Sequence, residues 1–263
     1  MVLQRLEDAE PGAVKVEGRG SKVWTILLDR PERKNAVNGD TARKLYRAFV
    51  EFENDPVACV AVLHGRNQVF CAGADLTEMS NPIISNVRDI GPMGISRLIL
   101  SKPVIAAVEG FCVAGGLELA CWCDMRVASE TATFGVFCRR WGVPLIDGGT
   151  VRLPRIIGQS RAIDMILTGR AVNAHEALAF GLANRVVPTG TALKEALDLA
   201  RDLAELPQNC MRNDRLSALE QWSFPEATAL ANEFGRGLSS LRAEAISGAA
   251  KFKGGAGRKG SKL

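Results

Sequence analysis

The stretch that decides the fold is residues 102–124, K-P-V-I-A-A-V-E-G-F-C-V-A-G-G-L-E-L-A-C-W-C-D. Its first part, Val104–Val108, is a continuous apolar run of the kind that forms a buried strand. A tight turn ends in Gly115 and Gly116, and a helix is predicted to begin there at once. The first N–H groups of a helix have no intrahelical partner, and the helix dipole favours negative charge beside them. The stretch therefore predicts a strand, a turn and a helix whose N-terminus suits an anion.

Gly115 and Glu118 are the residues of this stretch that suggest chemistry. Gly115 has no Cβ, so a substrate can approach its backbone closely. Glu118 follows three residues later, which places a backbone donor and a carboxylate within one helical turn. A structural interpretation, with a glycine for packing and a glutamate that complements the helix dipole, fits the stretch alone equally well.

A second segment, residues 69–76, has the sequence V-F-C-A-G-A-D-L and also predicts a turn of small residues after a buried strand. It follows a predicted buried strand at residues 58–63. Small residues surround Gly73, and Asp75 and Thr77 favour the start of a short helix. Two turns of this kind can direct two backbone N–H groups at one point, as a thioester oxygen requires when it becomes an enolate.

The composition narrows the possible functions. The chain has 263 residues, a net charge of +4 and 47% hydrophobic residues, which is typical of an ordinary globular protein. No apolar run is long enough to span a membrane and the N-terminus has no signal-peptide pattern, so we expect neither membrane association nor export. The two histidines, His64 and His175, have no neighbouring Ser or Asp pattern that suggests a triad. Any catalysis is therefore expected to rely on carboxylates and backbone dipoles.

The cysteines predict neither disulfides nor a metal site. Their number, seven, is odd, and they show no regular spacing. Cys121 and Cys123 lack a second pair of ligands, so no metal is expected there. Five cysteines with apolar neighbours are predicted to be reduced core residues: Cys59, Cys71, Cys112, Cys121 and Cys123.

The order of predicted elements indicates an α/β fold with a helical C-terminal region. Strands are predicted at residues 23–28, 58–63, 104–108, 125–128 and 184–187. Helices are predicted at residues 41–53, 149–157, 160–168, 174–180, 191–206, 209–222 and 225–250. The polar, proline-containing segment 81–97 is predicted to be a mobile loop that forms a lid or a wall of an acyl pocket.

Several motifs, in this order, resemble those of the crotonase superfamily, the enoyl-CoA hydratase/isomerase group. The resemblance covers residues 14–205. The motifs are Asp29-Arg30-Pro31 with Asn35-Ala36, residues 70–76, residues 102–108, residues 115–120, Gly148-Gly149-Thr150 with residues 153–158, and residues 167–170.

The resemblance implies a crotonase-like spiral of ββα units at residues 1–205, followed by a helical region and basic tail at residues 206–263. It also implies that this region helps to form a homotrimer or hexamer, and that the substrate is an acyl-CoA thioester. Coenzyme A is part of that substrate, so no separate cofactor is expected.

The resemblance further implies roles for individual residues. Ala74 and Gly115 are expected to supply the oxyanion-hole amides, and Glu118 is expected to be the main acid/base. The expected contacts with the substrate and its coenzyme A are Lys34, Ala36, Ala72, Gly73, Asp75 and Leu76, with Lys34 near phosphate.

The second catalytic glutamate of the family's hydratases has no counterpart in this sequence. Cys138 stands at its position, and a thiol is a poor substitute for a carboxylate in acid/base catalysis. The nearest carboxylate is Asp147, nine residues further on. Asp147 is interpreted either as the second catalytic carboxylate or as the cap of the helix predicted to begin at Gly149.

Enoyl-CoA hydration is the leading function, because Glu118 is retained beside intact glycines. The alternatives are enoyl-CoA isomerisation or another crotonase-type lyase reaction, and a non-catalytic acyl-CoA-binding or RNA-binding protein with a basic tail. Nucleic-acid binding is disfavoured, since a pure binder gains nothing from a buried carboxylate. The last residues, Ser261, Lys262 and Leu263, form a peroxisomal address in a eukaryotic protein. In a bacterium they have no such meaning, and a cytoplasmic location is expected.

Overall fold

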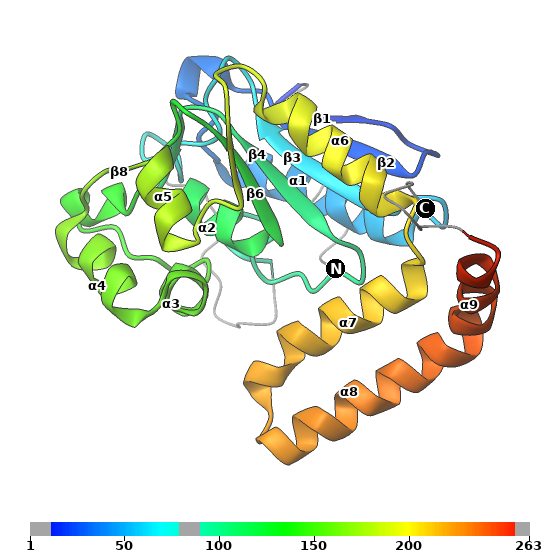
Figure 1. The fold of residues 1–263 in the computed structure, drawn as a ribbon. Helices are drawn as coiled ribbons and strands as arrows, with labels where there is room; N and C mark the ends of the chain where they lie inside the picture. The colour runs from blue at the N-terminus through cyan, green and yellow to red at the C-terminus, as the bar shows by residue number, and fades with distance from the viewer. Residues whose placement is uncertain (1–11, 79–89, 256–263) are drawn as a thin grey trace.

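The computed structural model describes residues 12–78 and 90–255. Its centre is a sheet of six strands in the order β1-β2-β3-β4-β6-β9 (Figure 1). All neighbouring pairs are parallel except β1 and β2. The strands are β1 (Val14–Glu17), β2 (Val23–Leu28), β3 (Val60–Gly65), β4 (Val104–Val108), β6 (Met125–Ser129) and β9 (Arg185–Val187).

The sheet is covered on both faces because its central strands are apolar on both sides. In β3, Ala61 and Leu63 pack into the core beneath α1 (Gly39–Asn54). The alternating residues Val60 and Val62 pack on the opposite face, against α6 (Ala192–Ala204). Figure 1 shows these two helices on opposite sides of the sheet. A continuous apolar run is the pattern of a strand buried on both faces.

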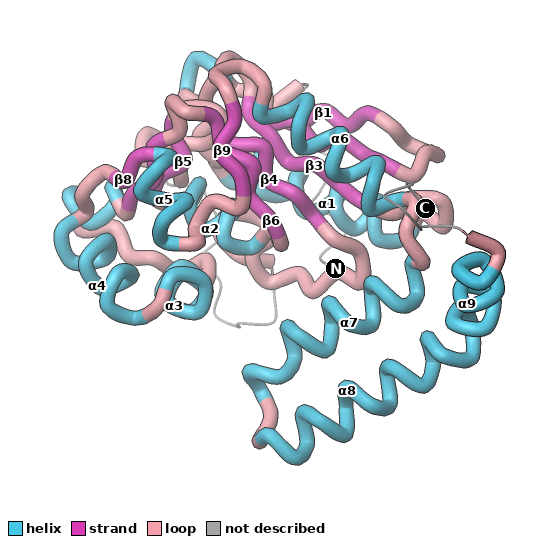
Figure 2. Tube along the Cα trace, in the orientation of Figure 1, coloured by secondary structure: helices cyan, strands magenta, loops and turns pink. Residues whose placement is uncertain are grey.

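The stretch between Val108 and Gly115, predicted to be a tight turn alone, has more structure than predicted. It contains a further strand, β5 (Phe111–Val113), which belongs to a second sheet of order β5-β7-β8 (Figure 2). The other two strands are β7 (Thr133–Gly135) and β8 (Val172–Asn173). Gly110, at φ 51°, allows the chain to turn sharply from one sheet into the other. The helix α2 (Gly115–Trp122) begins at the first of the two glycines in which the predicted turn ends.

The predicted α/β class with a helical C-terminal region is confirmed. The strand β7 is followed by α3 (Gly149–Ile157), α4 (Gln159–Thr168), α5 (Ala174–Phe180), α6 and α7 (Gln208–Glu220), and then by the C-terminal helices. The single helix predicted at residues 225–250 is wrong. It is divided into α8 (Glu226–Ser240), a π-helical turn (Leu241–Ala245) and α9 (Ile246–Lys253). The wider π turn changes the direction in which the following side chains point.

Helices α7 and α8 lie side by side and extend away from the main sheet. α8 runs back along α7, so that α9 lies at the end where α7 begins (Figure 1). Among the described residues, no helix is both long and apolar enough to cross a bilayer. The five cysteines predicted to lie in the core are buried: Cys59, Cys71, Cys112, Cys121 and Cys123. The basic residues Arg258, Lys259 and Lys262 and the C-terminal address lie outside the described residues, as does most of the predicted lid.

Candidate active site

A cavity of about 830 Å³ collects most of the residues that the sequence singled out. Eight of the ten predicted site residues line it: Lys34, Ala72, Ala74, Asp75, Leu76, Gly115, Glu118 and Asp147. The other described lining residues are largely apolar and include Pro92, Met93, Phe111, Phe137, Trp141 and Ile146. A mostly apolar cavity with a few convergent polar groups is typical of a small-molecule site.

The two small-residue turns lie directly beside each other. Cys71 pairs in parallel with Cys112, and the Val113 N–H donates to the Cys71 carbonyl at 3.1 Å. At Gly73, a Cβ would lie only 3.0 Å from the Gly115 nitrogen. The close approach of the two backbones therefore requires glycine at this position.

The N–H groups of Ala74 and Gly115 have no hydrogen-bond acceptor among the described residues. Gly115 is the first residue of α2, where an N–H has no partner within the helix. Ala114, immediately before it, has φ 53° and ψ −126°, a conformation that an alanine rarely adopts. Strain of this kind persists where the surrounding structure enforces it, and it often marks functional sites.

Glu118 lies on the first turn of α2 and is buried. Its Oε1 accepts hydrogen bonds from the backbone N–H groups of Asp147, at 2.9 Å, and Gly149, at 2.8 Å. Burial, with a smaller contribution from the charge of Asp147, raises the pKa of Glu118 to about 7, although the two amides oppose the shift. A carboxyl group with this pKa can both donate and accept a proton near neutral pH.

Asp147 is buried, and its side chain does not cap a helix. The N-cap of α3 is Gly148, so the capping interpretation is wrong. Asp147 Oδ1 instead accepts hydrogen bonds from the Met93 N–H, at 3.0 Å, and from the Ser96 hydroxyl. Burial raises the pKa of Asp147 against the effect of these two donors. The Ser96 and Met93 contacts draw the side chain toward the segment at residues 90–98 and away from the amides of α3.

Cys138 occupies a 3₁₀ turn (Phe137–Trp141) and lines the cavity. Burial raises the pKa of its thiol, and the nearby charge of Glu118 raises it further. The thiol is therefore neutral at physiological pH and does not act as a second carboxylate.

Some of the expected coenzyme A contacts line the cavity and others do not. Lys34 lies at the cavity with its Nζ 5.4 Å from the centre of the Phe111 ring, and Leu76 is partly exposed there. Ala36 and Gly73 are not among the described residues that line the cavity. The Ala36 carbonyl accepts a hydrogen bond from Arg30 Nη1 at 2.6 Å.

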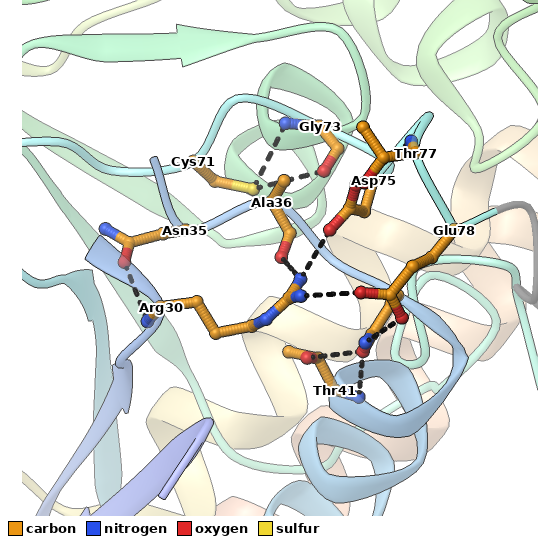
Figure 3. Close-up of polar contacts among 10 residues, drawn as sticks. Arg30, Asn35, Ala36, Thr41, Cys71, Gly73, Asp75, Thr77 and Glu78 are labelled. Carbon is orange, nitrogen blue, oxygen red and sulfur yellow. Dashed lines mark hydrogen bonds and ion pairs between the residues drawn. The ribbon is translucent and has the colours of Figure 1, made fainter. Parts of the chain in front are cut away.

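Asp75 lines the cavity, but its carboxylate is engaged within the protein. Oδ2 lies 3.0 Å from Arg30 Nη1, and Oδ1 accepts hydrogen bonds from the Thr77 N–H and hydroxyl (Figure 3). Burial favours a higher pKa for Asp75, but the bonds from Thr77 and Arg30 lower it overall. Asp75 therefore forms an Asx-type turn; a short helix beyond Glu78 would lie outside the described residues.

The sequence did not identify three polar groups around the site. Arg30 belongs to one of the family motifs, and the structure places it buried against Asp75 and Ala36. Ser96 and Arg97 lie within the predicted loop 81–97, and Arg97 lines the cavity while donating to the Ile146 carbonyl at 2.6 Å. All three depend on partners far away in sequence, so no local pattern reveals them.

The fold and this arrangement of amides and carboxylates define a class of protein. Residues 18–235 match the enoyl-CoA hydratase/isomerase family, and the chain belongs to that family. The resemblance seen in the motifs is thereby confirmed.

Individual proteins and a solved structure are similar to this chain. The enoyl-CoA hydratase EchA19 of Mycobacterium tuberculosis is 40% identical over 192 residues, which cover 70% of this chain and 72% of the relative. The carnitinyl-CoA dehydratase of Proteus mirabilis is 36% identical over 231 residues, 86% of this chain and 81% of the relative. The crystal structure of an enoyl-CoA hydratase from M. tuberculosis H37Rv has a TM-score of 0.86 and 32% identity, and the match covers 93% of this chain and 96% of that one.

Proposed function

We propose that this protein is an enoyl-CoA hydratase that adds water to a 2-enoyl-CoA through an enolate of the thioester. The observation that carries the proposal is the placement of Glu118, a buried carboxyl with a pKa of about 7, in one cavity with the unpaired N–H groups of Ala74 and Gly115. The relatives named as hydratases support the same reaction.

The two amides stabilise the charge that develops in the reaction. The thioester oxygen accepts hydrogen bonds from Ala74 and Gly115, and becomes negatively charged when water attacks C3. The dipole of α2, whose N-terminus includes Gly115, adds to this stabilisation. Because these donors are already in place, they need little reorganisation when the charge appears.

Glu118 exchanges protons through Oε2. Its Oε1 already accepts two backbone hydrogen bonds, so a proton on the carboxyl group is favoured on Oε2. The ionised form takes a proton from the attacking water, whose oxygen bonds to C3. The C2 carbon then takes a proton from the second acid/base group, Asp147, as the enolate returns to the thioester and the C2=C3 double bond becomes a single bond. The proton left on Glu118 is lost to solvent and Asp147 regains one from it, which restores both groups.

Asp147 is proposed as the second acid/base group, in place of the glutamate replaced by Cys138. It lines the cavity, is buried, and has a raised pKa, which keeps a larger fraction protonated than in an exposed aspartate. Oδ1 is held by Met93 and Ser96, which fixes the orientation of the group.

Isomerisation of a 3-enoyl-CoA to a 2-enoyl-CoA is the second candidate. The neutral Cys138 thiol at the position of the second glutamate favours it, because one base is sufficient to move a proton from C2 to C4. The same two amides stabilise the dienolate that forms.

The proposed ligand and assembly follow the family. Lys34 is placed to meet a phosphate of coenzyme A, and the apolar wall at Met93, Phe137 and Ile146 is placed to contain the acyl chain. A homotrimer or hexamer is proposed through the helices α7 to α9, which expose several large apolar side chains: Leu219, Leu230, Phe234, Ile246 and Phe252.

Purified protein assayed with crotonyl-CoA and, separately, with a 3-enoyl-CoA tests the proposal. Loss of the enoyl absorbance of crotonyl-CoA, with formation of 3-hydroxybutyryl-CoA, is expected. Conversion of only the 3-enoyl-CoA would favour the isomerase. No turnover of either thioester would overturn both.

A further inference from the structure

The Arg30 guanidinium joins two segments that border the proposed oxyanion hole. Its Nη1 donates to the Ala36 carbonyl at 2.6 Å and lies 3.0 Å from Asp75 Oδ2 (Figure 3). The side chains of Arg30 and Asp75 are only 7% and 4% exposed, so the ion pair is shielded from water. Arg30 Nη2 also reaches Glu78 Oε1 at 3.3 Å.

The backbone around Ala74 is held on both sides by the segment that Arg30 anchors. The Val37 N–H donates to the Gly73 carbonyl at 2.8 Å, and the Asp75 N–H donates to the Val37 carbonyl at 2.9 Å. The residue between these two bonds is Ala74, whose own N–H is left without an acceptor among the described residues. The orientation of this N–H therefore depends on where Val37 and Asp75 lie.

Arg30 fixes both of those positions. Its side chain donates a hydrogen bond to the carbonyl of Ala36, which precedes Val37. It also forms an ion pair with the carboxylate of Asp75, which follows Ala74. The backbone N–H of Arg30 donates to Asn35 Oδ1 at 3.1 Å, so the backbone and the side chain of Arg30 both hold the same turn. Removing one member of a buried ion pair leaves the other uncompensated and displaces the groups around it.

We infer that Arg30 is a positioning residue for the oxyanion hole, acting through Asp75 and Ala36 on the N–H of Ala74. The inference rests on the proposed function of that amide. An oxyanion donor that is displaced slightly stabilises the transition state less, while binding of the coenzyme A portion changes little. Arg30→Met is therefore expected to lower kcat by about tenfold to a hundredfold and to change KM by less than about threefold.

Arg66→Met is the matched control. Arg66 also pairs with an aspartate, through Nε to Asp29 Oδ1 at 2.9 Å and Nη2 to Asp29 Oδ2 at 3.1 Å. Its side chain is 43% exposed, and its hydrogen bonds and ion pair are with Asp29 rather than with Ala36 or Asp75. This variant removes an arginine–aspartate pair of the same chain without touching the segment that holds Ala74.

A thioester chromophore separates positioning from a merely structural role. A cinnamoyl-CoA with a para-dimethylamino group absorbs at longer wavelength when hydrogen bonds polarise its carbonyl. We expect a red shift with the parent protein and with Arg66→Met, a smaller shift with saturated Arg30→Met, and an intermediate shift with Arg30→Lys. The Tm of every variant is measured alongside.

Failure of the proposed oxyanion hole and failure of the positioning role give different results. Parent protein that binds the chromophore without a red shift would overturn the proposed oxyanion hole itself. A red shift and a kcat in Arg30→Met equal to those of the parent would overturn the positioning role alone. If Arg30→Met does not fold, Asp75→Asn tests the same link: a reduced shift supports the inference, and an unchanged shift contradicts it.

Discussion

The Asp147 backbone N–H donates a hydrogen bond of 2.9 Å to Glu118 Oε1, while the Asp147 side chain bonds to Met93 and Ser96. One residue thus contacts the proposed acid/base through its backbone and the wall of the cavity through its carboxylate. The orientation of Glu118 is consequently tied to the segment at residues 90–98, which also lines the site through Met93 and Arg97.

Glu118 is expected to make the free energy of unfolding depend on pH. Its pKa of about 7 in the folded protein exceeds the ordinary 4.5, so the folded state binds more protons than the unfolded state between these values. The contribution of Glu118 to the free energy of unfolding therefore falls as pH rises from about 4.5 to 7, by up to about 3 kcal/mol. Glu118→Gln removes this term, and the variant should gain stability relative to the parent across that window.

Urea unfolding of both proteins at pH 5 and pH 8 measures the effect. Glu130→Gln, at an exposed position, is the control and should follow the parent at both pH values. A difference between Glu118→Gln and the parent that is the same at the two pH values would contradict the raised pKa.

Asp147→Asn is expected to lower hydration of crotonyl-CoA at least about a hundredfold, because the amide cannot exchange a proton. Ser96→Ala removes one donor to the same carboxylate but leaves the acid, so a loss of less than about tenfold is expected. Steady-state kinetics with both variants checks this. Full activity of Asp147→Asn would leave Asp147 with only an anchoring role for residues 90–98.

Gly73→Ala is expected to damage the oxyanion hole. The new Cβ would lie 2.8 Å from the Ala114 Cβ and 3.0 Å from the Gly115 nitrogen, and φ is +100°. The two turns must separate, so turnover should fall about a hundredfold or more. Gly142→Ala, also at positive φ but with open space around its Cβ, is the control for backbone strain. Equal turnover in the two variants would show that the separation of the turns does not matter.

Ala114→Gly is expected to stabilise the fold by about 1 kcal/mol, because glycine tolerates φ 53° and ψ −126° while alanine is strained there. The free energy of unfolding in urea measures the gain. A net loss of stability would mean that the strain at Ala114 is small compared with the extra chain entropy of glycine in the unfolded state.

The sequence predicted the parts of the fold that depend on local patterns. Val104–Val108 and the start of α2 at Gly115 were predicted correctly, since an apolar run and a glycine pair are local signals. β5 was missed because three residues give no periodicity, and its strand character comes from pairing with β7. Prediction of the candidate site has the same limit, because contacts between distant residues leave no local pattern. Glu118 and Gly115 are recognisable by spacing, whereas the roles of Arg30 and Ser96 arise from Asp75 and Asp147, each more than forty residues away.

The measurement that tests the central claim most directly is the pH profile of kcat/KM for crotonyl-CoA hydration by the parent protein, compared with Glu118→Gln. With Glu118 as the base that takes a proton from water, kcat/KM should rise with pH through an inflection near pH 7, the pKa of the buried carboxyl in the free protein. In Glu118→Gln, kcat should fall about a thousandfold with little change in KM, and the profile of kcat/KM should lose that inflection. A variant that retains the parent's kcat and inflection would contradict the assignment of Glu118 as the acid/base.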